Sequence, residues 1–283
     1  MQQEEKYCLV MKIDKLNNLI IGIKGAGEMA SGVACRLFNS NFRHIFMMEI
    51  ENPMAVRRKV SFCESVHEGS VMVEGITAVK VGSSADFARA WDNEQLPVVV
   101  DPSWESIRAV SPHIIIDAII AKKNLGTGMD DAPLVIGLGP GFTAGDDVHT
   151  AIETNRGHNL GRLIFKGSPE ANTGVPGTIA GFNIERVLRA PCEGVFKPAK
   201  EIGDMVKAEE IIGHVDKEAV SAQISGVLRG LIRPDFLVKS GLKIGDIAPR
   251  GIKEYCNTIS EKARAIGGSV LEAILRQYNQ INI

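Results

Sequence analysis

The chain has 283 residues, which is enough for two domains or for one domain and a small module. An apolar content of 45% with 23% charged residues is that of a globular protein with a sizeable core. The net charge of −2 gives no global basic field, so charge does not indicate nucleic-acid binding. Five scattered cysteines without a C-x-x-C pair argue against a disulfide framework or a structural zinc.

No apolar run approaches the roughly 18 residues that a membrane helix needs. The first residues, MQQEEK, are polar and are not typical of a signal peptide. We therefore expect a cytoplasmic protein without a membrane partner.

The first informative stretch predicts a strand, a tight turn and a helix. Residues 19–23 form a β-branched apolar run typical of a buried strand, and residues from Ala30 onward recur at helical spacing. Gly25, Gly27 and Ala30 between them have the G-x-G-x-x-G/A spacing of a dinucleotide-binding unit. In such a unit Gly25 allows the turn, Gly27 leaves room for a pyrophosphate, and Ala30 lets the helix approach the strand.

An acidic residue should follow about 20 positions later, where it can hydrogen-bond a ribose. Residues 42–48 are apolar enough for the second strand, and Glu49 follows them. The alternative is a Rossmann-like fold in which the glycines serve packing alone. Lys24 and Glu28 are unusual in this turn, and Glu28 beside a phosphate weighs against ordinary NAD binding.

A helix start at Asn52-Pro53 is followed by Arg57, Arg58 and Lys59. These cations would form a phosphate clamp or, as an equal alternative, a solvated helix face.

Further strands are predicted at 71–81, 97–101, 113–120 and 134–138, with short helices at 86–91 and 104–110. The alternation predicts an α/β fold with a Rossmann-like, doubly wound and mostly parallel sheet. Asp101 and Asp117 close two of the strands. Since ligands bind at the carboxyl ends of strands in such sheets, both should lie near Gly25 and Gly27.

Gly137, Gly139 and Gly141 open a glycine-rich loop in which the backbone can wrap closely around a ligand. His149 and Glu153 would share a face if their segment were helical, and His158 follows. These three are the candidate catalytic groups, with Arg156 and Arg162 available to hold an anion. The alternatives are a metal site, which we do not expect, and a loop whose polar groups satisfy one another.

From residue 185 onward an internal repeat appears at an offset of 32, so that Val195 matches Val227 and Val206 matches Val238. Two such copies should pair into a small β barrel or sandwich. The pattern resembles the barrel-sandwich hybrid of biotinyl and lipoyl carrier modules, but it lacks their lysine-presenting turn, and Lys217 is a weak substitute. We interpret the module as structural or as an interaction surface.

Residues 260–278 predict a closing helix capped by Ser260, with Gly267-Gly268 either letting two helices approach or bending the helix. The predicted organisation is thus an extension at 1–17, a Rossmann-like domain at 18–184, the β module at 185–250 and a helical segment at 251–283.

Residues 18–277, through the motifs IKGAGEMASGVACRLF, EIENPMAVRRKVSF and GLGPGFTAGDDVHTAIETNRGHNLGR, resemble the YqeB-type accessory proteins of selenium-dependent molybdenum hydroxylases. The first half is also similar to the Rossmann domain of XdhC-type xanthine dehydrogenase maturation factors. The resemblance implies a role in maturing such a hydroxylase by handling a molybdopterin-type cofactor, and it implies the hydroxylase or other maturation proteins as partners. It supplies no catalytic residue, and a homo-oligomer is compatible with the fold class.

Three hypotheses follow. A maturation factor would bind a nucleotide or molybdopterin-type cofactor without turning over NAD(P)H. An NAD(P)-dependent oxidoreductase would use His149 or His158 as proton donor. A non-catalytic scaffold would dock the hydroxylase through the β module. We favour the first hypothesis.

Overall fold

The computed structural model describes residues 16–279 and divides them into two compact units. The first unit contains the described residues up to Pro53, Phe62–Asn172, and those from Ser260 onward. The second contains Met54–Ser61 and Thr173–Ile259. The N-terminal extension predicted for residues 1–17 lies almost wholly outside the described residues.

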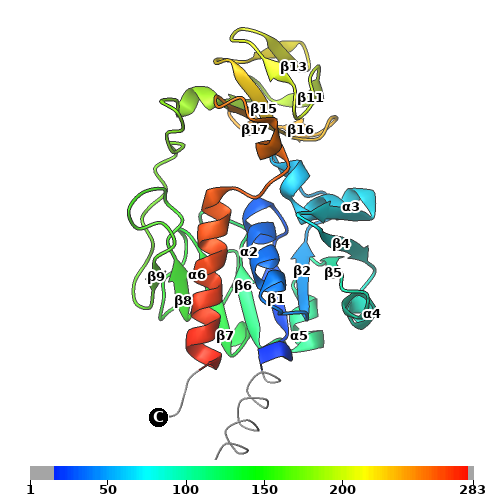
Figure 1. The fold of residues 1–283 in the computed structure, drawn as a ribbon, viewed down its shortest axis with the longest axis vertical. Helices are drawn as coiled ribbons and strands as arrows, with labels where there is room; N and C mark the ends of the chain where they lie inside the picture. The colour runs from blue at the N-terminus through cyan, green and yellow to red at the C-terminus, as the bar shows by residue number, and fades with distance from the viewer. Residues whose placement is uncertain (1–15, 280–283) are drawn as a thin grey trace, which may run out of the picture. The chain divides into compact units, whose positions relative to one another are not determined.

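A nine-stranded sheet organises the first unit (Figure 1), in the order β3-β4-β5-β2-β1-β6-β7-β8-β9. Its strands are β1 (Ile21–Lys24), β2 (Ile45–Glu49), β3 (Ser70–Val73), β4 (Ile76–Val81), β5 (Leu96–Val100), β6 (Ile114–Asp117), β7 (Leu134–Leu138), β8 (Thr150–Ile152) and β9 (Leu163–Ile164). Neighbouring strands are parallel except for the β3–β4 and β8–β9 pairs. The predicted α/β class with a mostly parallel sheet is confirmed.

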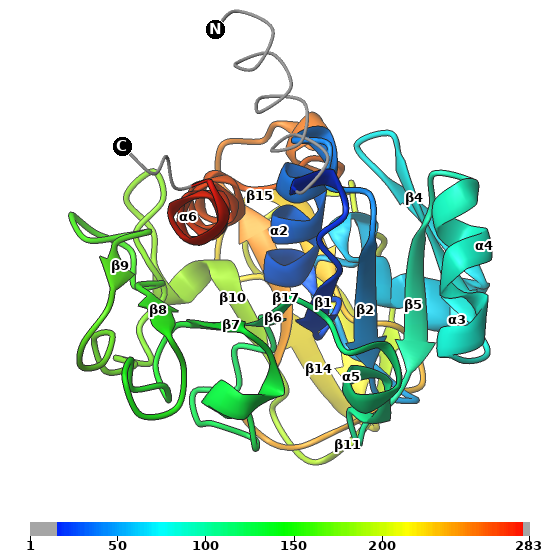
Figure 2. The ribbon, with the colours of Figure 1, turned by 90° about the horizontal axis from the view of Figure 1, so that it is seen from below.

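Helices cover this sheet. They are α2 (Glu28–Asn39), α3 (Ser65–Glu68), α4 (Phe87–Asp92), α5 (Glu105–Val110) and α6 (Glu261–Tyr278), with 3-10 turns η2 (Phe62–Glu64), η3 (Ser84–Asp86) and η4 (Met129–Asp131). Figure 2 shows α2 and α6 side by side on one face and α5 on the other. Phe87 of α4 and Ile107 of α5 join a core cluster with Phe46 of β2 and Val135 of β7. The predicted closing helix is confirmed as α6.

The start of α6 and its packing follow from small residues. The Ser260 hydroxyl accepts the Ala263 N–H at 3.4 Å, which makes Ser260 the predicted cap. A Cβ on Gly267 would lie 3.0 Å from the Gly32 carbonyl oxygen of α2. Of the glycine pair predicted in this helix, Gly267 therefore marks a close approach of two helix backbones.

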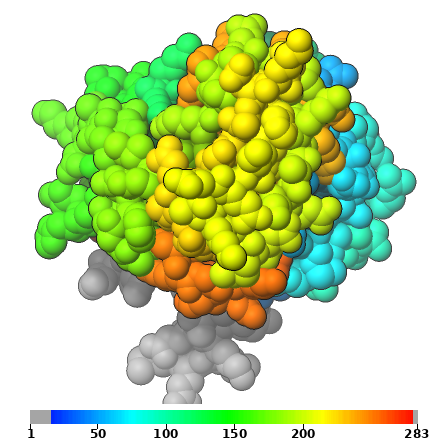
Figure 3. Space-filling view, turned by 90° about the horizontal axis from the view of Figure 1, so that it is seen from above, coloured from blue at the N-terminus to red at the C-terminus, as the bar shows by residue number. Residues whose placement is uncertain are grey.

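The second unit contains two four-stranded antiparallel sheets, in the orders β10-β17-β15-β12 and β14-β13-β11-β16. Its elements are β10 (Val187–Arg189), β11 (Gly194–Pro198), β12 (Met205–Val206), β13 (Ile211–Val215), β14 (Glu218–Ser221), β15 (Gly226–Leu231), β16 (Leu237–Val238), β17 (Lys243–Ala248), η1 (Arg58–Val60), η5 (Ile184–Arg186) and η6 (Lys253–Cys256). Its buried apolar side chains form a core of their own that includes Phe196. Much of the outer surface of this unit is yellow in Figure 3.

The internal repeat explains how these strands pair. β12 of the first copy pairs with β15 of the second, with Met205 opposite Val227. β16 of the second copy pairs with β11 of the first, with Leu237 opposite Val195. The two pairs are equivalent at the 32-residue offset, so the copies complete each other's sheets, as expected for repeats that cannot bury their faces alone.

Along residues 16–279, no helix combines the length and the apolar character needed to cross a membrane.

Candidate functional site

The glycine turn after β1 differs in conformation and in surrounding space between its two glycines. Gly25 has a positive φ of 86°, and its N–H donates to Met48 O at 2.8 Å. Gly27 caps α2 with an extended backbone, φ −70° and ψ −172°. A Cβ on Gly27 would meet no described atom within 4 Å, whereas one on Gly25 would lie 3.3 Å from Ile119 Cα. The turn is therefore fixed at Gly25 and open at Gly27.

The N-terminus of α2 faces this opening at Gly27. The first intrahelical bond is the one from Ser31 N–H to Gly27 O, at 2.8 Å, so the N–H groups of the first turn have no acceptor within the helix. Gly27, at the N-cap position, has no side chain to cap these groups. Ala30 is fully buried, which fits its predicted role of letting the helix approach the strand. Such a terminus favours an anion.

The predicted ribose-binding acid holds the turn itself. Oε2 of Glu49 accepts the Ala26 N–H and Oε1 accepts the Ile50 N–H, both at 2.9 Å. Burial raises the pKa of Glu49, while the two backbone hydrogen bonds lower it. The carboxylate retains lone pairs for a further donor. Glu49 therefore lies beside the turn, as predicted, and stabilises its conformation.

A buried ionic cluster lies at the carboxyl ends of β1 and β6. Lys24 is 1% exposed, and its Nζ donates to Thr127 Oγ1 and pairs with Asp131 Oδ2, each at 2.8 Å. Thr127 Oγ1 in turn donates to Asp117 Oδ2 at 2.7 Å. The Lys24 ammonium also lies 5.2 Å from the ring centroid of Trp104. These contacts link two acids and one cation directly before the glycine turn.

Strand register explains the cluster, because Lys24 and Asp117 are partners in the β1–β6 pair. Burial raises the pKa of Asp117, and the hydrogen bonds from Thr127 and Ile119, together with the charge of Lys24, oppose the shift. Perturbed, buried ionisable groups beside a strand end are typical of functional sites. Sequence reasoning placed Asp117 here but missed Thr127 and Asp131; the only local signal was the lysine ending an apolar strand.

Asp101 has a structural role. Its Oδ1 accepts the Glu105 N–H at 2.9 Å and its Oδ2 accepts the Ser106 N–H at 2.7 Å. The carboxylate thus caps α5, and the Asp101 N–H donates to Glu49 O at 2.9 Å. Asp101 lies along the predicted edge of the sheet, but its oxygens are engaged by the helix start.

Arg57 and Arg58 belong to the second unit. Arg57 Nη2 donates to the carbonyls of Tyr255 and Thr258 at 2.8 and 2.9 Å. Arg58 Nε donates to Leu231 O at 2.8 Å, and Lys59 Nζ donates to Ile202 O at 3.0 Å. All three cations bind backbone carbonyls of their own unit, which is a structural use of their charge.

Gly137 at the end of β7 and the next two glycines along the chain are closely packed. A Cβ would lie 2.6 Å from the Phe142 ring at Gly137, 2.5 Å from Thr154 Oγ1 at Gly139, and 2.6 Å from Lys123 Cα at Gly141. Gly139 and Gly141 also have positive φ values of 82° and 108°. The loop therefore wraps closely around its own chain at these three positions.

The three candidate catalytic residues do not gather. Residues 150–152 form strand β8, so the helical alternative does not hold, and His149 and Glu153 lie at opposite ends of that strand. His149 Nδ1 accepts the Val135 N–H at 3.0 Å, near the amino end of β7. Glu153 is buried and accepts the N–H groups of Asn155 and Glu170. His158 is exposed in the following loop.

Arg156 forms an ion pair with Glu261 at the start of α6, at 2.6 Å. Within residues 16–279, no three His, Cys, Asp or Glu side chains come together as metal ligands.

The first unit is thus an α/β unit with an open glycine turn. Comparison with known proteins shows what the chain is similar to. The chain is 44% identical over 261 residues to the uncharacterized protein YqeB of Escherichia coli strain K12. The match covers 92% of this chain and 48% of the E. coli protein, so the chain spans about half the length of that relative. This identity supports a YqeB-type sequence over the matched residues. No family model matches.

Two solved structures share low similarity. TcdA (CsdL) is 10% identical with a TM-score of 0.35, covering 95% of this chain and 92% of that one. A succinylglutamatedesuccinylase/aspartoacylase from Rhodobacter sphaeroides is 19% identical with a TM-score of 0.21, covering 29% of each chain. Neither similarity is close enough to support an argument about fold or function.

Proposed function

We propose that the first unit binds a nucleotide-bearing, anionic cofactor at the glycine turn after β1. The observation that carries the proposal is the open space at Gly27, where a ligand can contact the backbone at the N-terminus of α2. A pyrophosphate placed there would accept hydrogen bonds from the first-turn N–H groups and would benefit from the helix dipole. Rossmann-like, doubly wound sheets bind nucleotides at such a turn.

The ionic cluster suits the polar end of such a cofactor. Lys24 and Asp117 end the two central strands, and the turn begins at the next residue, Gly25. Asp131 is about one quarter exposed, so the cluster reaches the surface through its acidic member. Carboxylates and hydroxyls held in this way can orient hydrogen-bond donors, such as the amino groups of a pterin or the hydroxyls of a ribose.

We further propose that the protein is an accessory or maturation factor for a selenium-dependent molybdenum hydroxylase and that the cofactor is of the molybdopterin type. The support is the resemblance of the motifs, together with the open glycine turn at the N-terminus of α2. The second unit would serve as a barrel-sandwich-hybrid-like interaction module for the hydroxylase or another maturation protein. Its Lys217 lies exposed between β13 and β14.

The test uses Gly27→Val. Because Gly27 has an ordinary backbone conformation and its Cβ direction is empty, valine should leave the fold intact while filling the ligand space. Equilibrium titration with ADP, GDP and CDP as probes should show saturable binding of at least one nucleotide to the wild type. Gly27→Val should weaken that binding at least about tenfold.

Gly268→Val is the control, because Gly268 of α6 also has open space around it and lies outside the turn. It should bind the nucleotide like the wild type. Normal nucleotide binding by a folded Gly27→Val protein would show that the glycine turn is not the site.

A further inference from the structure

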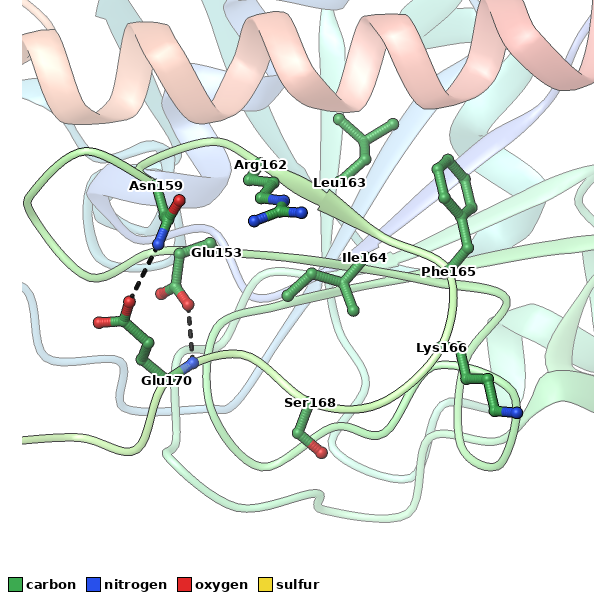
Figure 4. A pocket seen from close by; sticks show the side chains of 9 residues that line it. All are labelled: Glu153, Asn159, Arg162, Leu163, Ile164, Phe165, Lys166, Ser168 and Glu170. Atoms are coloured by element: carbon green, nitrogen blue, oxygen red, sulfur yellow. Dashed lines mark hydrogen bonds between the residues drawn. The ribbon is translucent and has the colours of Figure 1, made fainter.

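A polar pocket of about 440 Å³ lies beside β8 and β9, in the same unit as the glycine turn. Figure 4 shows the residues that line it: Glu153, Asn159, Arg162, Leu163, Ile164, Phe165, Lys166, Ser168 and Glu170. Its volume is in the range of small-molecule sites. β9 is four strands away from β1 in the sheet, which is roughly 19 Å at the usual strand spacing. The pocket is therefore separate from the proposed nucleotide site.

The two acids of the pocket are engaged by the protein. Glu153 accepts the N–H groups of Asn155 and Glu170 at 2.6 and 2.7 Å. The Glu170 carboxylate accepts the side-chain amides of Asn155 and Asn159 at 2.7 and 3.3 Å. These two hydrogen bonds lower the pKa of Glu170, so both carboxylates serve to hold the loop around the pocket.

The two cations of the pocket are not engaged in this way. Neither the Arg162 guanidinium nor the Lys166 ammonium has a hydrogen-bond or ion-pair partner within the described part of the chain. Ser168 adds a hydroxyl, which shares one hydrogen bond with Thr143 at 3.0 Å. The binding capacity left over in the pocket is therefore cationic and hydrogen-bond donating.

The side chains on β9 and next to it point in two opposite directions. Leu163 and Phe165 point toward α6, where Arg276 stacks 4.9 Å from the Phe165 ring, and Ile164 and Lys166 point the other way (Figure 4). Arg162, which directly precedes β9, also points away from α6 (Figure 4). Ile164 lies between the two cations along the chain and in Figure 4, and the chain bends at residues 165 and 166 after β9 ends.

We propose that this pocket binds an elongated organic dianion, with one anionic group on Arg162, the other on Lys166 and an apolar middle against Ile164. Carboxylates and phosphates both pair with arginine and lysine through charge-assisted hydrogen bonds. One small anion would leave the second cation unpaired, which is why two separated charges fit the arrangement better.

The experiment is isothermal titration of the full chain with three probes: adipate, fructose bisphosphate and hexanoate. Adipate and hexanoate have the same carbon length and differ in one charge. The expected result is one-to-one binding of adipate or fructose bisphosphate that is at least about tenfold tighter than that of hexanoate. Fructose bisphosphate carries more than one negative charge on each phosphate, so saturable binding of only one of the two probes identifies the carboxylate or the phosphate class.

Arg162→Gln and Lys166→Gln should each weaken dianion binding about tenfold or more. Both proteins should keep the wild-type melting temperature, because the two side chains are exposed and make no hydrogen bond or ion pair within the described residues. Arg156→Gln removes a nearby arginine that is already paired with Glu261, and it should bind the dianion normally. Gly27→Val should also bind it normally, which separates this site from the nucleotide site.

Three results would overturn the proposal. One is the absence of saturable binding of both adipate and fructose bisphosphate. Another is equal affinity for hexanoate. The third is unchanged dianion affinity in Arg162→Gln.

Discussion

Lys24 and Asp117 combine burial with opposite charge at paired positions of two central strands. Such a pair pays a desolvation cost that only good hydrogen bonding offsets. Thr127 supplies that bonding by accepting from Lys24 and donating to Asp117. We interpret the cluster as a site whose charges are retained for ligand binding, since apolar side chains would fill the same space at lower cost.

Asp117→Asn tests the electrostatics of this cluster. The pKa of Asp117 is raised above its ordinary value of 3.8, so the native state binds the proton more tightly than the unfolded state. This contribution to stability is complete below the unfolded pKa and is lost as pH rises through the folded pKa. The free energy of unfolding of the wild type minus that of Asp117→Asn should therefore fall as pH rises above about 4. Guanidinium titrations of both proteins across pH 4–8 measure this difference in the free energy of unfolding. A difference that rises with pH over this range would contradict the prediction.

At the residue scale, sequence reasoning predicted what local geometry dictates. The spacing of Gly25, Gly27 and Ala30 predicted the turn, and the end of an apolar run placed Asp117 at its edge. It could not predict that Asp131 pairs with Lys24, because the two are 107 residues apart. It also could not predict that backbone carbonyls engage Arg57 and Arg58, since carbonyls leave no pattern in side-chain types.

Helices α2 and α6 pack against each other at small residues. A Cβ on Gly32 would lie 2.7 Å from Ala263 Cβ, closer than real Cβ atoms come. Gly267 faces Gly32 from α6, and Gly268 beside it has open space. Neighbouring glycines in one helix thus have opposite packing requirements.

Gly32→Ala should lower the free energy of unfolding by about 1–3 kcal/mol, because the added methyl group forces the two helices apart. Gly268→Ala is the matched control and should raise it by up to about 1 kcal/mol, since alanine is the better helix former. Chemical denaturation followed by circular dichroism measures both variants. Equal stabilisation by the two substitutions would show that the crossing is not tightly packed.

At the element scale, α6 could be predicted because its apolar face repeats over 18 residues. The segment after His149 could not be assigned, since three strand residues are too few to distinguish a period of two from one of 3.6. Its strand character comes from pairing with β7 and β9, which are tertiary contacts.

Within residues 16–279, each of the two units has an apolar core of its own. Phe46 is fully buried in the core of the first unit, and Phe196 is fully buried in that of the second. The repeat at an offset of 32 made the second core partly predictable, because equivalent strands had to pair. That β12 and β16 would each join the other copy's sheet could not be predicted, since two-residue strands carry no pairing signal.

Phe196→Ala should destabilise the second unit by about 3–5 kcal/mol. Differential scanning calorimetry should then show a transition that moves to lower temperature and another that stays in place, because the two cores share no residue. Phe46→Ala should move the other transition. A single transition that both substitutions shift equally would contradict this account.

Native mass spectrometry of the full chain tests the central claim most directly. The protein is purified from a molybdenum-replete host and is measured intact and after denaturation, beside Gly27→Val. We predict that the wild type releases a pterin dinucleotide or another nucleotide-bearing anion and that Gly27→Val is empty. Release of the same ligand from both proteins, or of NAD(P) from the wild type, would contradict a molybdopterin-type cofactor bound at the glycine turn.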